Sequence, residues 1–203
     1  MFHAGDPQVD VYKIASGTAR LYKNLADGRR QVLGFLLAGD LVGLELQQQH
    51  LCSAQTIVCT RVHCVPAPVV RTFALESPKL MFELYQALAN ELAAVQDLAL
   101  SIGRSDAEER LARFLVALSR RNERQGRDPA MIDLKMPRSD IADYLGFTIE
   151  TVSRTFRKLE KQRLINLAQR RLVQILDMKR LLELMDGLHR MRRRRRKRER
   201  AIL

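Results

Sequence analysis

The segment TIETVSRT, residues 148–155, places a carboxylate, a hydroxyl and a guanidinium within about one turn of a helix. These groups belong to Glu150, Ser153 and Arg154. In a DNA major groove, an arginine can donate two hydrogen bonds to guanine and a glutamate can accept one from cytosine, while a serine is short enough to approach a base edge or a thymine methyl. A solvated helix surface could carry the same residues, so the surrounding elements have to distinguish the two interpretations.

The residues around this segment predict a helix-turn-helix. A short helix in DIADYL can be capped by Ser139 and is broken by Gly146, and Thr148 can cap a second helix that runs to about Gln162. In such a motif the first residues of the second helix enter the major groove. We therefore predict a helix-turn-helix over about residues 138–157, with TIETVSRT at its DNA-facing end.

The flanking sequence predicts the rest of a winged helix domain. Ser105-Asp-Ala-Glu resembles a capping box before the helix EERLARFLVALSRRNER, which is followed by the loop QGRDPAMID. The stretch RLINLAQRRLVQILD alternates like two short strands joined at residues 169–170, and Asp177 can cap a last helix, MKRLLELMDGL. Helix, turn, capped helix and hairpin, in that order, indicate a winged helix-turn-helix.

A second set of polar and basic residues in this region is placed to contact DNA phosphates, which position a protein without reading sequence. These candidates are Arg138, Ser139, Thr148, Thr151, Arg157, Lys158, Arg170 and Arg171. For several of them, a plain solvated charge explains the residue equally well.

After Pro78 the sequence has a different period. Apolar residues recur every seven positions in two series, and Glu91 interrupts the second series. This pattern predicts a helix of about 25 residues with a coiled-coil seam. The seam could pack on its own domain, but its length and regularity favour a parallel dimer. The seam residues are Met81, Leu84, Leu88, Val95, Leu98 and Ile102.

The sequence from residue 11 to about residue 70 predicts short strands. VYKIASGTARLYKN alternates around Gly17, ADGRR supplies an Asp-Gly hairpin turn, and QVLGFLLAGD resumes a strand. Closely spaced short strands with glycine turns indicate a small β-barrel or roll. The predicted organisation is a β-roll over residues 1–77, a dimerisation helix over 78–104, a winged helix-turn-helix over 105–186 and a basic tail over 187–203.

The chain has 203 residues and a net charge of +12, and the excess of positive charge lies in its C-terminal half. Residues 1–105 hold nine basic and nine acidic side chains, residues 106–189 hold seventeen and thirteen, and residues 190–203 hold nine and one. This asymmetry points to a polyanionic partner, nucleic acid first and acidic lipid second. The tail RMRRRRRKRER could add DNA affinity that depends on salt and not on sequence.

Other function classes have little support in the sequence. No apolar run approaches the length of a membrane helix, and the first residues do not resemble a secretory signal, so we expect a cytoplasmic protein without membrane association. The three cysteines, Cys52, Cys59 and Cys64, form no CxxC pair, and the histidines form no metal-binding pattern. Because no catalytic triad, phosphate loop or paired carboxylates occur in motif context, we expect no enzyme and no metal site.

Along nearly its whole length the sequence resembles the Crp/Fnr family of bacterial transcription regulators. FHAGDPQVDVYKIASGTARLYK and LLAGDLVGLE resemble the β-roll of the family, and SDIADYLGFTIETVSRTFRKLE resembles its DNA-binding domain. The resemblance implies an α+β fold with a jelly roll like that of cyclic-nucleotide-binding domains. It also implies a homodimer that binds double-stranded DNA and, as an activator, contacts RNA polymerase.

The recognition helix and the roll each resemble a particular branch. Glu150, two residues and then Ser153-Arg154 match the Fnr-like and FixK-like members, which implies TTGAT half-sites in a palindrome. In the cyclic-nucleotide branch an arginine holds the phosphate, and Cys52 stands at that place here. Cys64 resembles one ligand of the iron–sulfur branch and is a possible redox residue, but one thiolate cannot hold a cluster that needs four. The resemblance therefore implies a FixK-like regulator without a cofactor.

Two alternatives remain open at the level of sequence. The same DNA-binding scaffold could be gated by a small molecule, by a haem bound through His50 or His63, or by a redox signal in the roll. More remotely, the chain could be an interaction module that uses the coiled coil and the basic tail on a partner other than DNA.

Overall fold

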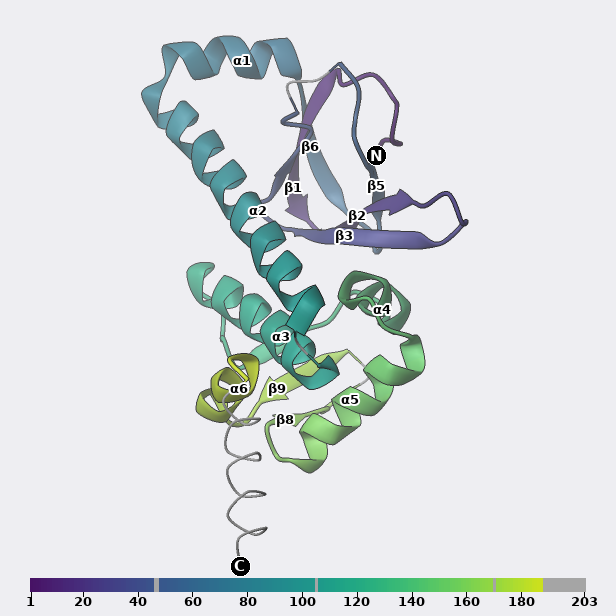
Figure 1. The fold of residues 1–203 in the computed structure, drawn as a ribbon. Helices are drawn as coiled ribbons and strands as arrows, with labels where there is room; N and C mark the ends of the chain where they lie inside the picture. Colours follow the sequence, from purple (N-terminus) through teal and green to yellow (C-terminus); the bar gives the residue numbers. More distant parts are fainter. Residues whose placement is uncertain (46–47, 105, 170, 188–203) are drawn as a thin grey trace, which may run out of the picture. The chain divides into compact units, whose positions relative to one another are not determined.

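The computed structural model describes residues 1–45, 48–104, 106–169 and 171–187. These residues form two compact units, divided between Leu100 and Ser101, which are described separately (Figure 1). The predicted α+β architecture, with an N-terminal β domain, a long helix and a C-terminal helix-turn-helix, is confirmed.

The first unit is a β-roll followed by two helices. Its strands pair in two antiparallel three-stranded sheets, of order β4-β1-β6 and β3-β2-β5. Its elements are β1 (Asp10–Ser16), β2 (Thr18–Asn24), β3 (Arg30–Leu37), β4 (Leu41–Val42), β5 (Ser53–Thr56), β6 (Arg61–Pro66), α1 (Ala67–Glu76) and α2 (Pro78–Arg104), the last of which continues into the second unit.

The roll has an apolar core between its sheets and tight turns at its edges. Buried core residues come from both sheets, among them Ile14, Leu21 and Val42. Gly17 joins β1 to β2 with φ of +95°, and a Cβ there would lie 2.5 Å from the backbone of Thr60. Only glycine fits such a position without strain. The hairpin between β2 and β3 confirms the turn predicted from Asp-Gly.

Helix α1 corrects the sequence prediction, which extended the strands to about residue 70. Val69 and Val70 favour a strand, but Pro68 lies in the first turn of α1, where its fixed φ suits a helix. The small residues Ala67 and Ala74 are the buried ones of this helix. A proline inside a strand has no backbone N–H to donate to the neighbouring strand. Pro68 is therefore stronger evidence for a helix than the two valines are for a strand.

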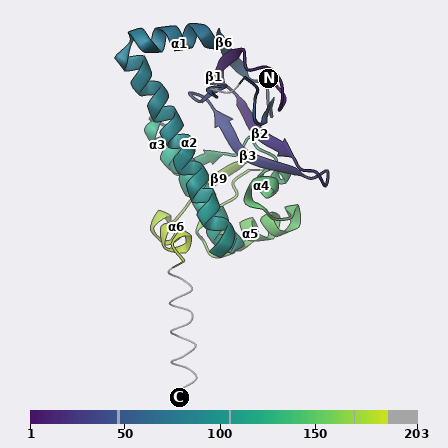
Figure 2. The same ribbon diagram turned by 45° about the horizontal axis from the view of Figure 1, so that its top comes forward.

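Helix α2 confirms the predicted long helix, and Figures 1 and 2 show it as one continuous element. Apart from Phe82, its exposed large apolar residues among those described are spaced alternately four and three apart, and each is between 44% and 66% exposed. This apolar stripe comprises Met81, Tyr85, Leu88, Leu92 and Val95. It contains Met81, Leu88 and Val95 of the first predicted series together with Tyr85 and Leu92. Leu84 of the second series is half-buried, and its place in the seam stays a prediction. The side chains of Leu98 and Ile102 lie outside the described residues.

The second unit is a winged helix-turn-helix (Figure 1). Three antiparallel strands in the order β7-β9-β8 lie with helices α3 to α6, and α3 packs against both α5 and α6. The elements are α3 (Ala107–Arg124), β7 (Met131–Asp133), α4 (Arg138–Leu145), α5 (Ile149–Lys161), β8 (Ile165–Asn166), β9 (Leu172–Ile175) and α6 (Met178–Met185). The predicted order of elements is confirmed, with β7 as an additional strand in the predicted loop.

The helix caps confirm two predictions and correct two others. Thr148 and Asp177 cap α5 and α6 as expected. The α3 cap is Asp106, whose carboxylate forms a capping box with Glu109. Ser105 lies outside the described residues. Ser139 does not cap α4, because the helix begins at Arg138 after Pro137 and has no side-chain cap. Proline before the first turn already fixes an extended backbone there.

Within the described residues, no helix is long and apolar enough to cross a membrane.

Candidate nucleic-acid interface

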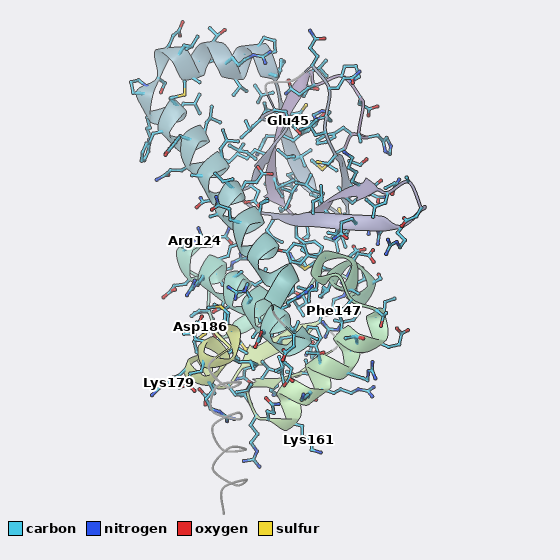
Figure 3. All side chains as sticks on the ribbon, viewed as in Figure 1. Glu45, Arg124, Phe147, Lys161, Lys179 and Asp186 are labelled. Atoms are coloured by element: carbon cyan, nitrogen blue, oxygen red, sulfur yellow. The ribbon has the colours of Figure 1, made fainter. Side chains whose placement is uncertain are left out.

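The turn between α4 and α5 sets the start of the candidate recognition helix. Gly146 ends α4 in the left-handed conformation, with φ of +71°, and Phe147 N donates to Ala142 O at 3.0 Å. Thr148 then caps α5, because its Oγ1 accepts a hydrogen bond from Thr151 N at 3.2 Å. In Figure 3, Phe147 lies at this turn and Lys161 lies at the far end of α5.

Helix α5 has one buried face and one polar face. The buried residues are Val152, Thr155, Phe156 and Leu159. The base-reading candidates lie at the other side of the first turn and a half: Glu150 and Arg154 are exposed, and Ser153 is half-buried. Thr151 Oγ1 lies 3.4 Å from Arg154 Nη2, which orients the guanidinium beside the helix.

Glu150 is poised to act as a hydrogen-bond acceptor. Its own backbone N–H, followed by the hydroxyl of Thr148 and the charge of Arg154, lowers the pKa of the Glu150 carboxyl. The carboxyl is therefore ionised at neutral pH, and an ionised carboxylate can only accept. That is the requirement for pairing with cytosine N4, which is a donor.

The candidate residues for phosphate contacts differ in their exposure and in their contacts within the domain. Arg157, Arg171 and Thr148 are exposed, Ser139 and Thr151 are half-buried, and Arg170 lies outside the described residues. Two of the basic candidates already have partners inside the domain. The Arg138 guanidinium lies 3.5 Å from the centre of the Phe156 ring, where burial lowers its pKa to about 10. Lys158 forms an ion pair with Glu108 of α3.

Sequence reasoning missed Arg110, which holds the turn of the motif from α3. Its Nη1 donates to Leu145 O, the last carbonyl of α4, at 2.8 Å, and its guanidinium lies 4.7 Å from the centre of the Phe147 ring. One side chain thus satisfies the C-terminus of α4 and packs on Phe147, the residue just before the Thr148 cap of α5. No local pattern identifies it, since its partners lie about 35 residues away in the sequence.

Arg110→Met is expected to destabilise the second unit by about 2–3 kcal/mol, because it removes a charge-assisted hydrogen bond and a cation–π contact while keeping an apolar stem. Urea unfolding measures the change. Arg124→Met, at the exposed end of the same helix, is the control and should leave the free energy of unfolding nearly unchanged. Equal midpoints for both variants would contradict the assigned role of Arg110.

In the roll, the residue at the place of the phosphate-binding arginine has acidic surroundings. Cys52 packs against the core, and burial together with the carboxylates of Glu45 and Glu91 raises the pKa of its thiol to about 11. His50 is buried, stacks on Phe2 with ring centres 3.6 Å apart, and has its Nδ1 3.5 Å from Glu45 Oε2. Such surroundings disfavour an anion.

A second sensor candidate is the possible redox residue Cys64. Cys64 is exposed on β6 opposite Tyr12 of β1, and partial desolvation and Asp10 raise the pKa of its thiol. A raised pKa reduces the reactive thiolate fraction at neutral pH, which weakens the redox interpretation. Among the residues that the structure describes, no group of three or more potential ligands could hold a metal ion.

Comparison with known proteins identifies both units. A model of the Crp-like helix-turn-helix domain matches residues 109–184, and a model of the cyclic nucleotide-binding domain matches residues 1–76. The chain is 41% identical over 169 residues to the transcriptional activatory protein AadR of Rhodopseudomonas palustris, which covers 81% of the chain and 69% of the relative. It is also 41% identical over 162 residues to the nitrogen fixation regulation protein FixK of Bradyrhizobium diazoefficiens, which covers 79% and 68%.

A solved structure has the same fold over most of the chain. The structure of FixK2 from Bradyrhizobium japonicum aligns with a TM-score of 0.83 at 35% identity and covers 91% of both chains.

Proposed function

The chain belongs to the Crp/Fnr family of transcription regulators, and we propose that it is a homodimeric activator. As a DNA-binding regulator of the FixK/Fnr type, it would read a palindrome of TTGAT half-sites. The observation that carries the proposal is the first part of α5. There an ionised Glu150 and an exposed Arg154 flank Ser153 on a capped helix of a winged helix-turn-helix. Acceptor and bidentate donor are the two groups that distinguish cytosine and guanine in the major groove.

The homodimer is supported by the apolar stripe of α2. Five large side chains on one face of a helix remain exposed in the single chain, and their alternating spacing of four and three is that of a coiled-coil seam. Burial of such a stripe against a second copy would remove it from water. A twofold dimer also presents two α5 helices to two half-sites, which is what a palindrome requires.

The activator role and the contact with RNA polymerase rest on relatedness. The relative from Rhodopseudomonas palustris is named as a transcriptional activatory protein, and we propose that this chain likewise recruits RNA polymerase. Transcription in vitro from a promoter that carries the palindrome tests this role directly. Stimulation by the protein supports it, and repression or no effect contradicts it.

A gel shift with and without the palindrome tests DNA reading against the alternative of an interaction module that does not use DNA. Preference for the palindrome over a scrambled duplex of equal composition supports the proposed function. Equal binding to both would assign the affinity to general basic charge, to which residues 190–200 would contribute.

Cyclic AMP at millimolar concentration is expected to change neither the melting temperature nor the DNA affinity. The phosphate would meet Cys52 instead of an arginine, with the carboxylates of Glu45 and Glu91 nearby. Any ligand well above its dissociation constant raises the melting temperature by mass action, so differential scanning fluorimetry is a sufficient measurement. A clear upward shift would favour the ligand-gated alternative.

A further inference from the structure

Glu108 connects the first turn of α3 to the second half of α5. Its carboxylate forms an ion pair with Lys158 Nζ and accepts a hydrogen bond from Gln162 Nε2 at 2.9 Å. The side chain of Glu108 is only 13% exposed, whereas that of Lys158 is 52% exposed. An exposed ion pair generally contributes little to stability. The Glu108 carboxylate differs, because it is largely buried and has two hydrogen-bond donors from one face of α5.

The position of Glu108 on its own helix also favours the charge. It is the second residue of α3, where the helix dipole stabilises an anion, and its backbone N–H donates to the Asp106 cap at 3.0 Å. The carboxylate therefore stays fixed at a capped, well-defined helix start. It can serve as a rigid reference point for α5.

The partners of Glu108 lie on the same ridge of α5 as the base-reading guanidinium. Arg154, Lys158 and Gln162 follow one another at intervals of four residues, so they form one row along the helix. Apolar packing of α5 holds the helix in place but is non-directional. The contacts of Glu108 are directional, and they resist rotation of α5 about its axis.

We propose that Glu108 is a positioning residue for DNA recognition, which sets the rotation of α5 through Lys158 and Gln162 and thereby aims Arg154. This inference rests on the proposed function, because it assumes that α5 reads DNA. It also assigns Lys158 a contact within the domain that orients the helix, in place of the phosphate contact predicted from sequence. Recognition sites work only when the contacting groups are held within about 0.5 Å and 10–20° of their productive geometry.

The test compares Glu108→Gln, Lys158→Met and the double variant on the palindrome and on a scrambled duplex, across a series of salt concentrations. Each single change should lower affinity for the palindrome about three- to tenfold, and the double variant should lose no more, because both remove one coupled contact. Affinity for scrambled DNA and the salt dependence should stay unchanged. Glu123→Gln, which removes an exposed carboxylate from the same helix, should affect neither duplex.

If Lys158 instead contacts a DNA phosphate, the opposite pattern of affinities is expected. Lys158→Met would then weaken both duplexes and flatten the slope of log affinity against log salt by about 0.9 per protomer, and Glu108→Gln would tighten both. That result would overturn the proposal, as would additive losses in the double variant.

A second readout separates this inference from the proposed function. If the unmodified protein shows no preference for the palindrome, the proposed function fails. The coupling is still measured without DNA, by comparing the urea midpoints of the single and double variants. Non-additive midpoint shifts confirm that Glu108 holds α5, and fully additive shifts overturn it.

Discussion

Arg154→Ala is expected to lower the affinity for a TTGAT palindrome by about 1–3 kcal/mol for each half-site, counted twice in a dimer. The guanidinium is exposed on the first turns of α5, beside Thr151, and it can reach guanine O6 and N7 together. Its loss should also relax the preference at the contacted base pair. Titrations on the palindrome and on single-base variants of it measure both effects.

Deletion of residues 190–200 is the control for Arg154→Ala, because it also removes positive charge. The deletion should weaken the palindrome and scrambled DNA alike and flatten the salt dependence, since phosphate contacts release counterions whatever the sequence. Only Arg154→Ala should change the ratio of specific to non-specific affinity. Should it lower both affinities equally, the base-reading roles of Glu150, Ser153 and Arg154 would have to be withdrawn.

Val95→Glu is expected to convert the dimer into a monomer. Val95 belongs to the apolar stripe of α2, so in a symmetric seam the change brings two carboxylates together near the axis, where desolvation and repulsion both oppose association. Sedimentation velocity should show the monomer. Affinity for the palindrome should fall by about 10²-fold or more, because the second half-site is no longer bound at high effective concentration.

Asn90→Glu is the matched control for the seam. Asn90 is exposed on α2 and lies nine residues after Met81, which places it half a turn away from the stripe. The same charge there should leave the dimer and its DNA affinity intact. A Val95→Glu variant that remains dimeric with normal affinity would show that the stripe does not form the interface.

The order of elements could be predicted from the sequence because local signals determine it. Gly146 and Thr148 mark the end of one helix and the start of the next through backbone conformation and capping, which act within a few residues. Asp177, which caps α6, and the Asp-Gly turn between β2 and β3 are local signals of the same kind. Where local signals conflicted, prediction failed: the valines of α1 favoured a strand although Pro68 favoured a helix.

The side-chain contacts from α3 to α4 and α5 could not be predicted, because they join residues far apart in the chain. Arg110 reaches Leu145, and Glu108 reaches Lys158 across 50 residues. Periodicity likewise could not choose between Leu84 and Tyr85 for the seam, since both fit a seven-residue repeat with Met81. In the single chain Leu84 is half-buried, whereas Tyr85 is exposed.

Selection of bound sequences from random double-stranded DNA tests the central claim most directly. Enrichment of a palindrome is expected, with two TTGAT half-sites whose centres lie about one DNA turn apart, each read by one α5 helix. Selection with the Arg154→Ala variant should lose the guanine preference in both half-sites. Recovery of no common sequence, or of a site that the Arg154→Ala variant selects unchanged, would contradict the claim that α5 reads bases.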